Sequence, residues 1–150
     1  LYLCGLGMTP LFDRDEGYYV SIVMNMIHGN NHYMIPFYNE ASWLHKPAML
    51  YWMMKSSVSV FGDNIFAMRF HSGFSAILLA LSMQYLLTKI LNDKVTAFII
   101  TVSTMLMPLL VIISRTSMID TPLVLFTTLT WLLLFIAIES PNDKDDFFLE

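Results

Sequence analysis

Residues 12–52 read FDRDEGYYVSIVMNMIHGNNHYMIPFYNEASWLHKPAMLYW, a stretch that holds charges, aromatic rings, three of the four histidines and a His45-Lys46-Pro47 triplet. It lies beside three apolar runs long enough to cross a membrane, at residues 70–91, 95–114 and 121–138. A simple connection between membrane helices needs no such set of side chains, and loops are where binding and catalytic residues concentrate. The stretch therefore predicts a functional site at the membrane surface.

The composition indicates the class of protein. The chain has 150 residues, of which 56% are hydrophobic and 13% charged, whereas soluble domains carry about 25% charged residues. Together with the three apolar runs, this deficit predicts an all-α integral membrane protein in contact with membrane lipids. The net charge of −4 argues against a nucleic-acid partner, and the single Cys4 excludes an internal disulfide.

The two ends of the chain resemble pieces of longer elements. Residues 1–11 are apolar but shorter than the roughly 20 residues that a spanning helix needs, so we interpret them as the end of a first span. Residues 141–150 are polar and acidic, as in a loop. We therefore expect residues 1–150 to be the N-terminal part of one membrane-embedded domain, with residues 12–69 as its first large loop.

Two helices are predicted within this loop, both lying in the membrane interface. In residues 16–28 apolar side chains recur at helical spacing opposite a polar face, which is typical of an amphipathic interfacial helix. Asp15 is expected to cap this helix, and Glu16 suits the positive end of its dipole. Residues 47–61 form a second helix that Pro47 opens and Gly62 ends, too short to span comfortably.

Counting spans brings two polar segments together. Two crossings separate the loop at residues 12–69 from the connection at residues 115–120, so both lie on one side of the membrane. The basic residues of the loop alone would favour the cytoplasmic side. The charged residues expected to converge on this side are Asp15, Glu16, Lys46, Arg69, Arg115 and Asp120.

Each of these residues has an ordinary structural interpretation beside the functional one. Asp15, Glu16 and Asp120 are either catalytic acids or groups that stabilise helix starts. Lys46, Arg69 and Arg115 either bind a lipid phosphate or extend to the headgroups. His45 is a metal ligand or a hydrogen-bonded loop residue, without an HxxxH spacing to support a metal site.

The order of these features resembles the beginning of the polyprenyl-phosphate-dependent membrane glycosyltransferases of the GT-C class. An apolar stretch is followed by Asp-Glu at the start of an amphipathic helix, a turn with Tyr-x-Ile-Pro, then Lys-Pro, a Tyr-Trp helix, Phe-Gly and a later Arg. The resemblance is to the bacterial branch that includes the aminoarabinose transferase of lipid A and the protein O-mannosyltransferases. The matching residues are Asp15, Glu16, Tyr19, Pro36, Lys46, Pro47, Tyr51, Trp52, Phe61, Gly62, Arg69, Arg115 and Asp120.

This resemblance implies a fold and a reaction. It implies a GT-C type multi-span helical bundle in a bacterial inner membrane, with the first large loop on the periplasmic or exterior side. It implies inverting transfer of a sugar from a polyprenyl-phosphate donor to a lipid, glycan or protein acceptor. We expect residues 1–150 alone to be inactive, because later helices would complete such a donor cavity.

The resemblance also implies roles for individual residues. Asp15 matches the catalytic acid of the family, Asp120 its second acid, and Lys46 the lysine that meets the donor phosphate. Related aminoarabinose transferases often carry Glu before this Lys-Pro, where it can meet a divalent metal ion, and here the residue is His45. The predicted site is catalytic Asp15, Asp120 and Glu16, phosphate-binding Lys46, Arg69 and Arg115, and further substrate contacts at Tyr19, His45 and Tyr51.

Two other functions fit a chain of this composition. A transporter or flippase would use its acids as ion relays at mid-membrane depth, whereas the acids here lie in predicted loops. A non-enzymatic membrane scaffold would tolerate substitution of Asp15 and Lys46.

Overall fold

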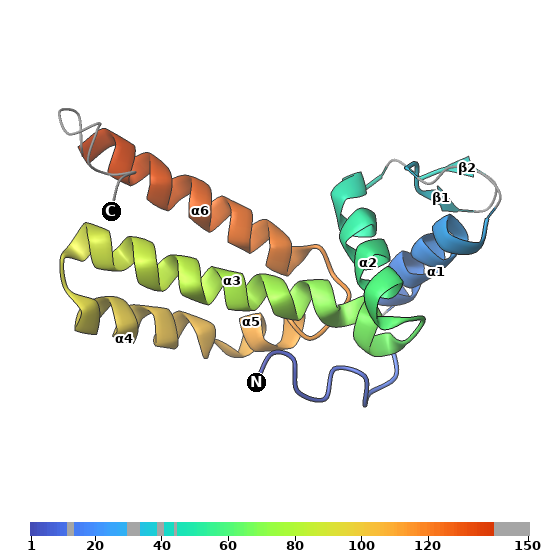
Figure 1. Cartoon of the computed structure of the whole chain (residues 1–150), viewed down its shortest axis with the longest axis horizontal. Helices are drawn as coiled ribbons and strands as arrows, with labels where there is room; N and C mark the ends of the chain where they lie inside the picture. The colour runs from blue at the N-terminus through green and yellow to red at the C-terminus, as the bar shows by residue number, and fades with distance from the viewer. Residues whose placement is uncertain (12–13, 30–33, 39–40, 44, 140–150) are drawn as a thin grey trace.

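The computed structural model describes residues 1–11, 14–29, 34–38, 41–43 and 45–139, and it is built almost entirely from helices. Three helical segments lie lengthwise beside one another, and a group of shorter elements lies across one end of them (Figure 1). In chain order the elements are α1 (Arg14–His28), β1 (Phe37–Tyr38), β2 (Ala41–Ser42), α2 (Ala48–Phe61), α3 (Ile65–Leu91), α4 (Lys94–Met105), α5 (Pro108–Ile113) and α6 (Asp120–Glu139).

Helix α3 is the central element, and it starts earlier than residue 70. The side chain of Asn64 caps it by accepting a hydrogen bond of 2.9 Å from the Ala67 backbone N–H. The helix then runs for 27 residues to Asn92, which adopts the left-handed conformation that commonly ends a helix. Arg69 therefore lies inside a helix rather than in the loop that precedes it.

The apolar run at residues 95–114 was predicted as one continuous spanning helix, and the structure divides it into two helices. The helix ends at Met105, and a new short helix starts at Pro108. Proline has no N–H to continue the preceding helix but suits a first helical position, so Pro108 interrupts rather than kinks the run. In the described part of the chain, two helices are long and apolar enough to cross a membrane, Ile65–Leu91 and Asp120–Ile138.

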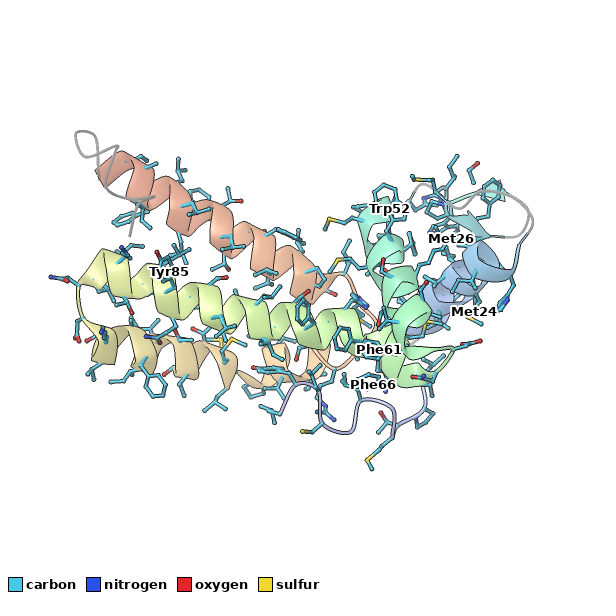
Figure 2. The ribbon with its side chains drawn as sticks, viewed as in Figure 1. Met24, Met26, Trp52, Phe61, Phe66 and Tyr85 are labelled. Atoms are coloured by element: carbon cyan, nitrogen blue, oxygen red, sulfur yellow. The ribbon has the colours of Figure 1, made fainter. Side chains whose placement is uncertain are left out.

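The path of the chain still brings the two predicted polar segments to one end. Helix α3 leads away from α1 and α2, α4 and α5 return along it, and α6 leads away again (Figure 1). The connection at residues 115–120 consequently lies beside the start of α3. Large side chains of these lengthwise helices are exposed (Figure 2), including Tyr85, which lies on the side of α3 that faces α6 and is 54% exposed.

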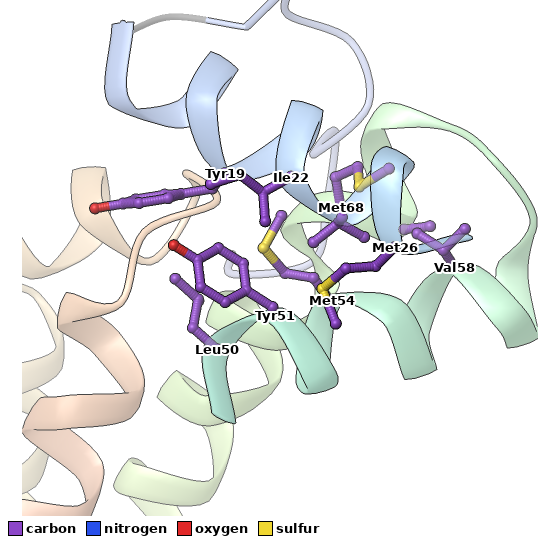
Figure 3. Packing of buried hydrophobic residues seen from close by; sticks show 10 residues of the cluster. Tyr19, Ile22, Met26, Leu50, Tyr51, Met54, Val58 and Met68 are labelled. Atoms are coloured by element: carbon purple, nitrogen blue, oxygen red, sulfur yellow. The ribbon is translucent and has the colours of Figure 1, made fainter. Parts of the chain in front are cut away.

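The shorter elements enclose a core of their own. The apolar face of α1 packs on α2 and on the first turn of α3, so the amphipathic helix predicted at residues 16–28 is confirmed, starting two residues earlier. Helix α2 matches its predicted limits, with Pro47 before it and Gly62 after it. Figure 3 shows this core, which consists of Tyr19, Ile22, Val23, Met26, Leu50, Tyr51, Met54, Val58, Ala67 and Met68.

Two local expectations are corrected. Residues 1–11 form turns rather than the end of a helix, and they run along the start of α3, where the Leu6 side chain is buried. Helix α1 begins at Arg14, so Asp15 lies in its first turn and is not the cap residue. An acid in the first turn still interacts favourably with the helix dipole.

Candidate active site

Glu16 and Arg69 form a buried ion pair at the centre of the region where the predicted polar segments meet. Both side chains are almost inaccessible, with 0% and 2% of their surface exposed. The Nε and Nη2 groups of Arg69 donate to the two carboxylate oxygens of Glu16, at 2.7 and 2.8 Å. This two-bond geometry is the strong form of an arginine–carboxylate contact, and it offsets the cost of removing two charges from water.

The remaining hydrogens of Arg69 are directed at the first residues of the chain. Nη1 donates to the Leu6 carbonyl oxygen at 2.9 Å and to both oxygens of Thr9, and Nη2 donates to the Pro10 carbonyl oxygen at 2.9 Å. A guanidinium has five N–H donors, and all of them now have protein acceptors. In this arrangement Arg69 has no N–H left for a donor phosphate, and Glu16 presents no exposed oxygen to an acceptor.

The same carboxylate fixes the connection between α5 and α6. The Ser117 backbone N–H donates to Glu16 Oε1 at 2.9 Å, across 101 positions of sequence. The next residue, Met118, accepts a hydrogen bond of 3.1 Å from the Ser72 hydroxyl on α3. Three residues after Ser117 the chain reaches Asp120, so these contacts determine where Asp120 lies.

The charges of Asp15, Lys46 and Asp120 all act on the Tyr19 hydroxyl. The ring of Tyr19 is buried, at 6% exposure. Burial is the largest cause that raises its pKa, the carboxylates of Asp15 and Asp120 raise it further, and the Lys46 ammonium opposes them through charge and a hydrogen bond. The three charged side chains are themselves exposed. The structure thus brings together four predicted site residues that are up to 105 positions apart in sequence.

Tyr51 lies next to Tyr19 inside the core. Their ring centroids are 6.1 Å apart in an edge-to-face arrangement, and both hydroxyls point towards the side on which α6 begins (Figure 3). Burial, followed by the proximity of Tyr19, raises the pKa of Tyr51 to about 12. Among the described residues its hydroxyl reaches no partner with hydrogen-bond geometry, although the Trp43 indole is near enough to oppose this pKa shift.

An apolar hollow of about 280 Å³ opens beside these charged groups. Pro47, the neighbour of Lys46, forms one part of its wall, and Ile119, the neighbour of Asp120, forms another. The hollow therefore lies between the start of α2 and the start of α6, and the exposed Lys46 directly precedes its wall residue Pro47 in the chain. Its other lining residues are Met49, Leu50, Pro122, Leu123 and Phe126.

His45 and Arg115 lie apart from the buried pair. The His45 ring packs on the Trp43 indole at a centroid distance of 4.6 Å and is exposed. In the part of the chain that the structure describes, no three His, Cys, Asp or Glu side chains are grouped to hold a metal ion. Arg115 Nη1 donates to the Leu1 carbonyl oxygen at 2.7 Å, and its guanidinium is partly accessible.

Sequence reasoning missed the backbone groups of the site. The Ser117 N–H and the carbonyls of Leu6, Thr9 and Pro10 complete the ion pair, and backbone groups leave no signal in a sequence. The sequence holds one indirect signal of these partners. Arg69 lies one turn inside an apolar helix, where a charged side chain needs a partner.

Comparisons with known proteins identify a family and several relatives of this chain. The sequence model of a family described as dolichyl-phosphate-mannose-protein mannosyltransferase matches residues 45–149. A curated protein from Shewanella sediminis, named undecaprenyl phosphate-alpha-4-amino-4-deoxy-L-arabinose arabinosyl transferase, is 33% identical over 143 residues, which are 95% of this chain and 26% of that protein. A protein of the same name from Yersinia pestis is 25% identical over 142 residues, with the same coverage of both chains.

The chain spans about a quarter of the length of these curated relatives, since the matched residues make up 26% of each. An Enterobacter protein of the same name is 33% identical over 97 residues, which are 65% of this chain and 17% of that protein. No solved structure matches the chain.

Proposed function

The chain belongs to the dolichyl-phosphate-mannose-protein mannosyltransferase family, and from this premise we propose that it is part of a membrane glycosyltransferase that takes a sugar from a polyprenyl-phosphate donor. The observation that supports the proposal is that the charges of Asp15, Lys46 and Asp120 all act on the pKa of the Tyr19 hydroxyl, so that these side chains lie within electrostatic reach of it. These groups come from three separate segments and remain exposed. Two carboxylates and an ammonium at one end of apolar helices supply the charges that such a transfer needs.

The proposed reaction is a single displacement with inversion at the anomeric carbon. Asp15 accepts the proton of an acceptor hydroxyl, whose oxygen attacks the anomeric carbon as the bond to the donor phosphate breaks. The polyprenyl phosphate leaves as an anion. Lys46 neutralises the developing charge together with Arg115, whose guanidinium lies beside the Leu1 carbonyl group. Asp120 orients the acceptor hydroxyl. The acceptor is a lipid, glycan or protein.

The apolar hollow gives the donor lipid a place beside its phosphate. Its walls come from the starts of α2 and α6, next to Lys46 and Asp120. An isoprenoid chain is entirely apolar, so it gains free energy by leaving water for such a surface. The sugar then lies on the exposed side, near Asp15.

The central test replaces one oxygen of Asp15. Asp15→Asn in the intact protein keeps the size of the side chain and removes its basicity, and loss of a positioned base lowers the rate by about 10²–10⁴-fold. The measurement is sugar transfer from a polyprenyl-phosphate donor at matched thermal stability. Asp63→Asn is a matched control, because Asp63 is an exposed acid in the turn between α2 and α3. Turnover by Asp15→Asn equal to that of the control would contradict the proposed role.

The proposed phosphate contact has its own matched pair of lysines. Lys46→Ala should weaken use of the lipid donor by tens to hundreds of fold, because a charge-assisted hydrogen bond contributes about 1.5–3 kcal/mol. Lys55→Ala, on α2, should have little effect on the donor KM. Equal effects of the two substitutions would assign Lys46 to membrane headgroups instead.

We also propose that this end of the helices faces the periplasm or the exterior in a bacterial inner membrane. Ser56 on α2 and Lys94 at the α3–α4 turn are exposed at opposite ends of α3. In a Cys4→Ser background, Ser56→Cys should react with an impermeant thiol reagent in intact cells, and Lys94→Cys should not. The reverse pattern would place the site in the cytoplasm.

A further inference from the structure

We propose that Glu16 and Arg69 do not touch the substrate but form a positioning pair, which holds the connection at residues 115–120, and with it Asp120, against the start of α1. The effect of this pair on sugar transfer rests on the proposed function. Its effect on the placement of the connection does not, because it follows from contacts within the described structure.

The first step of the argument is that the pair joins four segments. Glu16 belongs to the first turn of α1, Arg69 to the second turn of α3, and the acceptors Leu6, Thr9 and Pro10 to the first residues of the chain. The Ser117 N–H adds the connection between α5 and α6. Each contact is between 2.7 and 3.0 Å, and both charged side chains are buried. A buried charge keeps its partners because solvent offers no replacement.

The second step is that the pair lies next to both proposed acids. Glu16 follows Asp15 in the chain, so the position of one carboxylate fixes the helix turn that carries the other. Ser117 precedes Asp120 by three residues, and Met118 between them is held by Ser72 from the other side. A shift of the connection would therefore move Asp120 relative to Asp15. A misplacement of about 1 Å between reacting groups can lower a rate by about a hundredfold.

The third step distinguishes a positioning role of Arg69 from direct contact with the donor phosphate. All five N–H donors of Arg69 already have protein acceptors, and the side chain is nearly inaccessible. Lys46, in contrast, is exposed next to the apolar hollow. Loss of the pair should therefore lower kcat and leave the donor KM nearly unchanged.

The experiment uses Ser117 as a reporter of the connection. Ser117 is fully buried and its hydroxyl has no partner among the described residues, so Ser117→Cys removes no side-chain hydrogen bond. The comparison reporter is Ser57→Cys, at a buried serine of α2 whose hydroxyl donates to the Ala67 carbonyl oxygen at 2.6 Å. Each is placed singly in the intact protein with Cys4→Ser, purified in detergent, and the rate of maleimide modification is measured with and without Glu16→Gln.

We expect the connection at residues 115–120 to become accessible while the core of α1 and α2 stays protected. Glu16→Gln should speed modification of Cys at position 117 by about ten- to a hundredfold, the effect of weakening charge-assisted hydrogen bonds, while the reporter at position 57 stays protected. Arg69→Gln should do the same and lower kcat without raising the donor KM. The proposal is supported even if no sugar transfer is found, provided that the two reporters separate in this way.

Three results would overturn the proposal. Continued protection at position 117 in both variants would show that the pair does not hold the connection. Equal exposure at positions 117 and 57 would show a general loosening of the fold. A raised donor KM in Arg69→Gln with position 117 still protected would instead assign Arg69 to the donor phosphate.

Discussion

Helices α1 and α6 expose opposite kinds of side chains. In α1 the buried residues are mostly apolar, with Tyr19, Ile22, Val23 and Met26 against α2, and the polar side chains other than Glu16 face outward. In α6 Thr121 is fully buried, whereas large apolar residues such as Trp131, at 67% exposure, face outward. The region of α1 and α2 is therefore organised like a water-soluble core, and the lengthwise helices like a structure surrounded by lipid.

This difference explains where a site can form. A lipid-facing surface offers no hydrogen bonds, so polar groups of the lengthwise helices turn inward, as Arg69, Ser72 and Ser75 do on α3. The region of α1 and α2 can leave charges exposed at its surface, as with Asp15 and Lys46. The proposed site lies between the lipid-facing helices and the region of α1 and α2. Four substitutions, each with a control, test the difference between these two regions.

The largest effect is expected from Arg69→Met. It leaves the Glu16 carboxylate buried without its cation, and removing one partner of a buried pair costs about 3–5 kcal/mol of unfolding free energy. Lys94→Met, at an exposed turn, should change stability by less than about 0.5 kcal/mol. Chemical denaturation of the intact protein in detergent measures both, and equal stabilities would mean that the pair is not buried in the membrane-bound protein.

A second pair of substitutions compares a side chain in the core of α1 and α2 with an exposed side chain on α4. Ile22→Ala removes a fully buried side chain from the core of α1 and α2 and should cost about 2–5 kcal/mol. Ile99→Ala on α4, at 58% exposure, leaves no cavity and should cost less than about 0.5 kcal/mol. Similar losses in the two variants would show that Ile99 packs against protein rather than lipid.

The third substitution places a charge on the outer face of α6. Trp131→Lys near the middle of this helix should disfavour membrane insertion by about 2.5–3.5 kcal/mol, because a central lysine carries that cost. Ser56→Lys on the exposed face of α2 should leave insertion unchanged. A translocon-based insertion assay measures both, and full insertion of α6 with Lys at position 131 would contradict its contact with lipid.

The smallest effect is expected from Tyr51→Phe. The hydroxyl is buried without a described partner, so its removal should change stability by less than about 1 kcal/mol at neutral pH. The pKa of Tyr51 is raised to about 12, above the value of about 10 in an unfolded chain. The unfolded state therefore loses its proton first, and stability falls as pH rises from 10 to 12.

Tyr51→Phe should make this alkaline loss of stability smaller. Unfolding measured between pH 9 and 12 checks the sign, with Tyr18→Phe as the control. An unchanged alkaline profile in Tyr51→Phe would mean that the Tyr51 hydroxyl is accessible to water in the intact protein.

Several features were predictable because they are local. The limits of α2 follow from Pro47 and Gly62, and the buried face of α1 follows from helical spacing of apolar residues. The run at residues 95–114 was expected as one span, and at Pro108 it is divided into α4 and α5. A proline predicts that the hydrogen-bond ladder fails, but the contacts of the following turn determine how far the two helices separate.

By itself the sequence determined the helical class, the apolar outer surfaces and the presence of Asp15, Lys46 and Asp120 near helix starts, because composition and periodicity record which side chains are available and at what spacing. Only the tertiary structure decided that Glu16 and Arg69 form a buried pair with each other, with the Ser117 N–H and three carbonyls as further partners. The physical reason is that an ion pair is determined by distance and burial, and its backbone partners are chemically identical at every position of the chain.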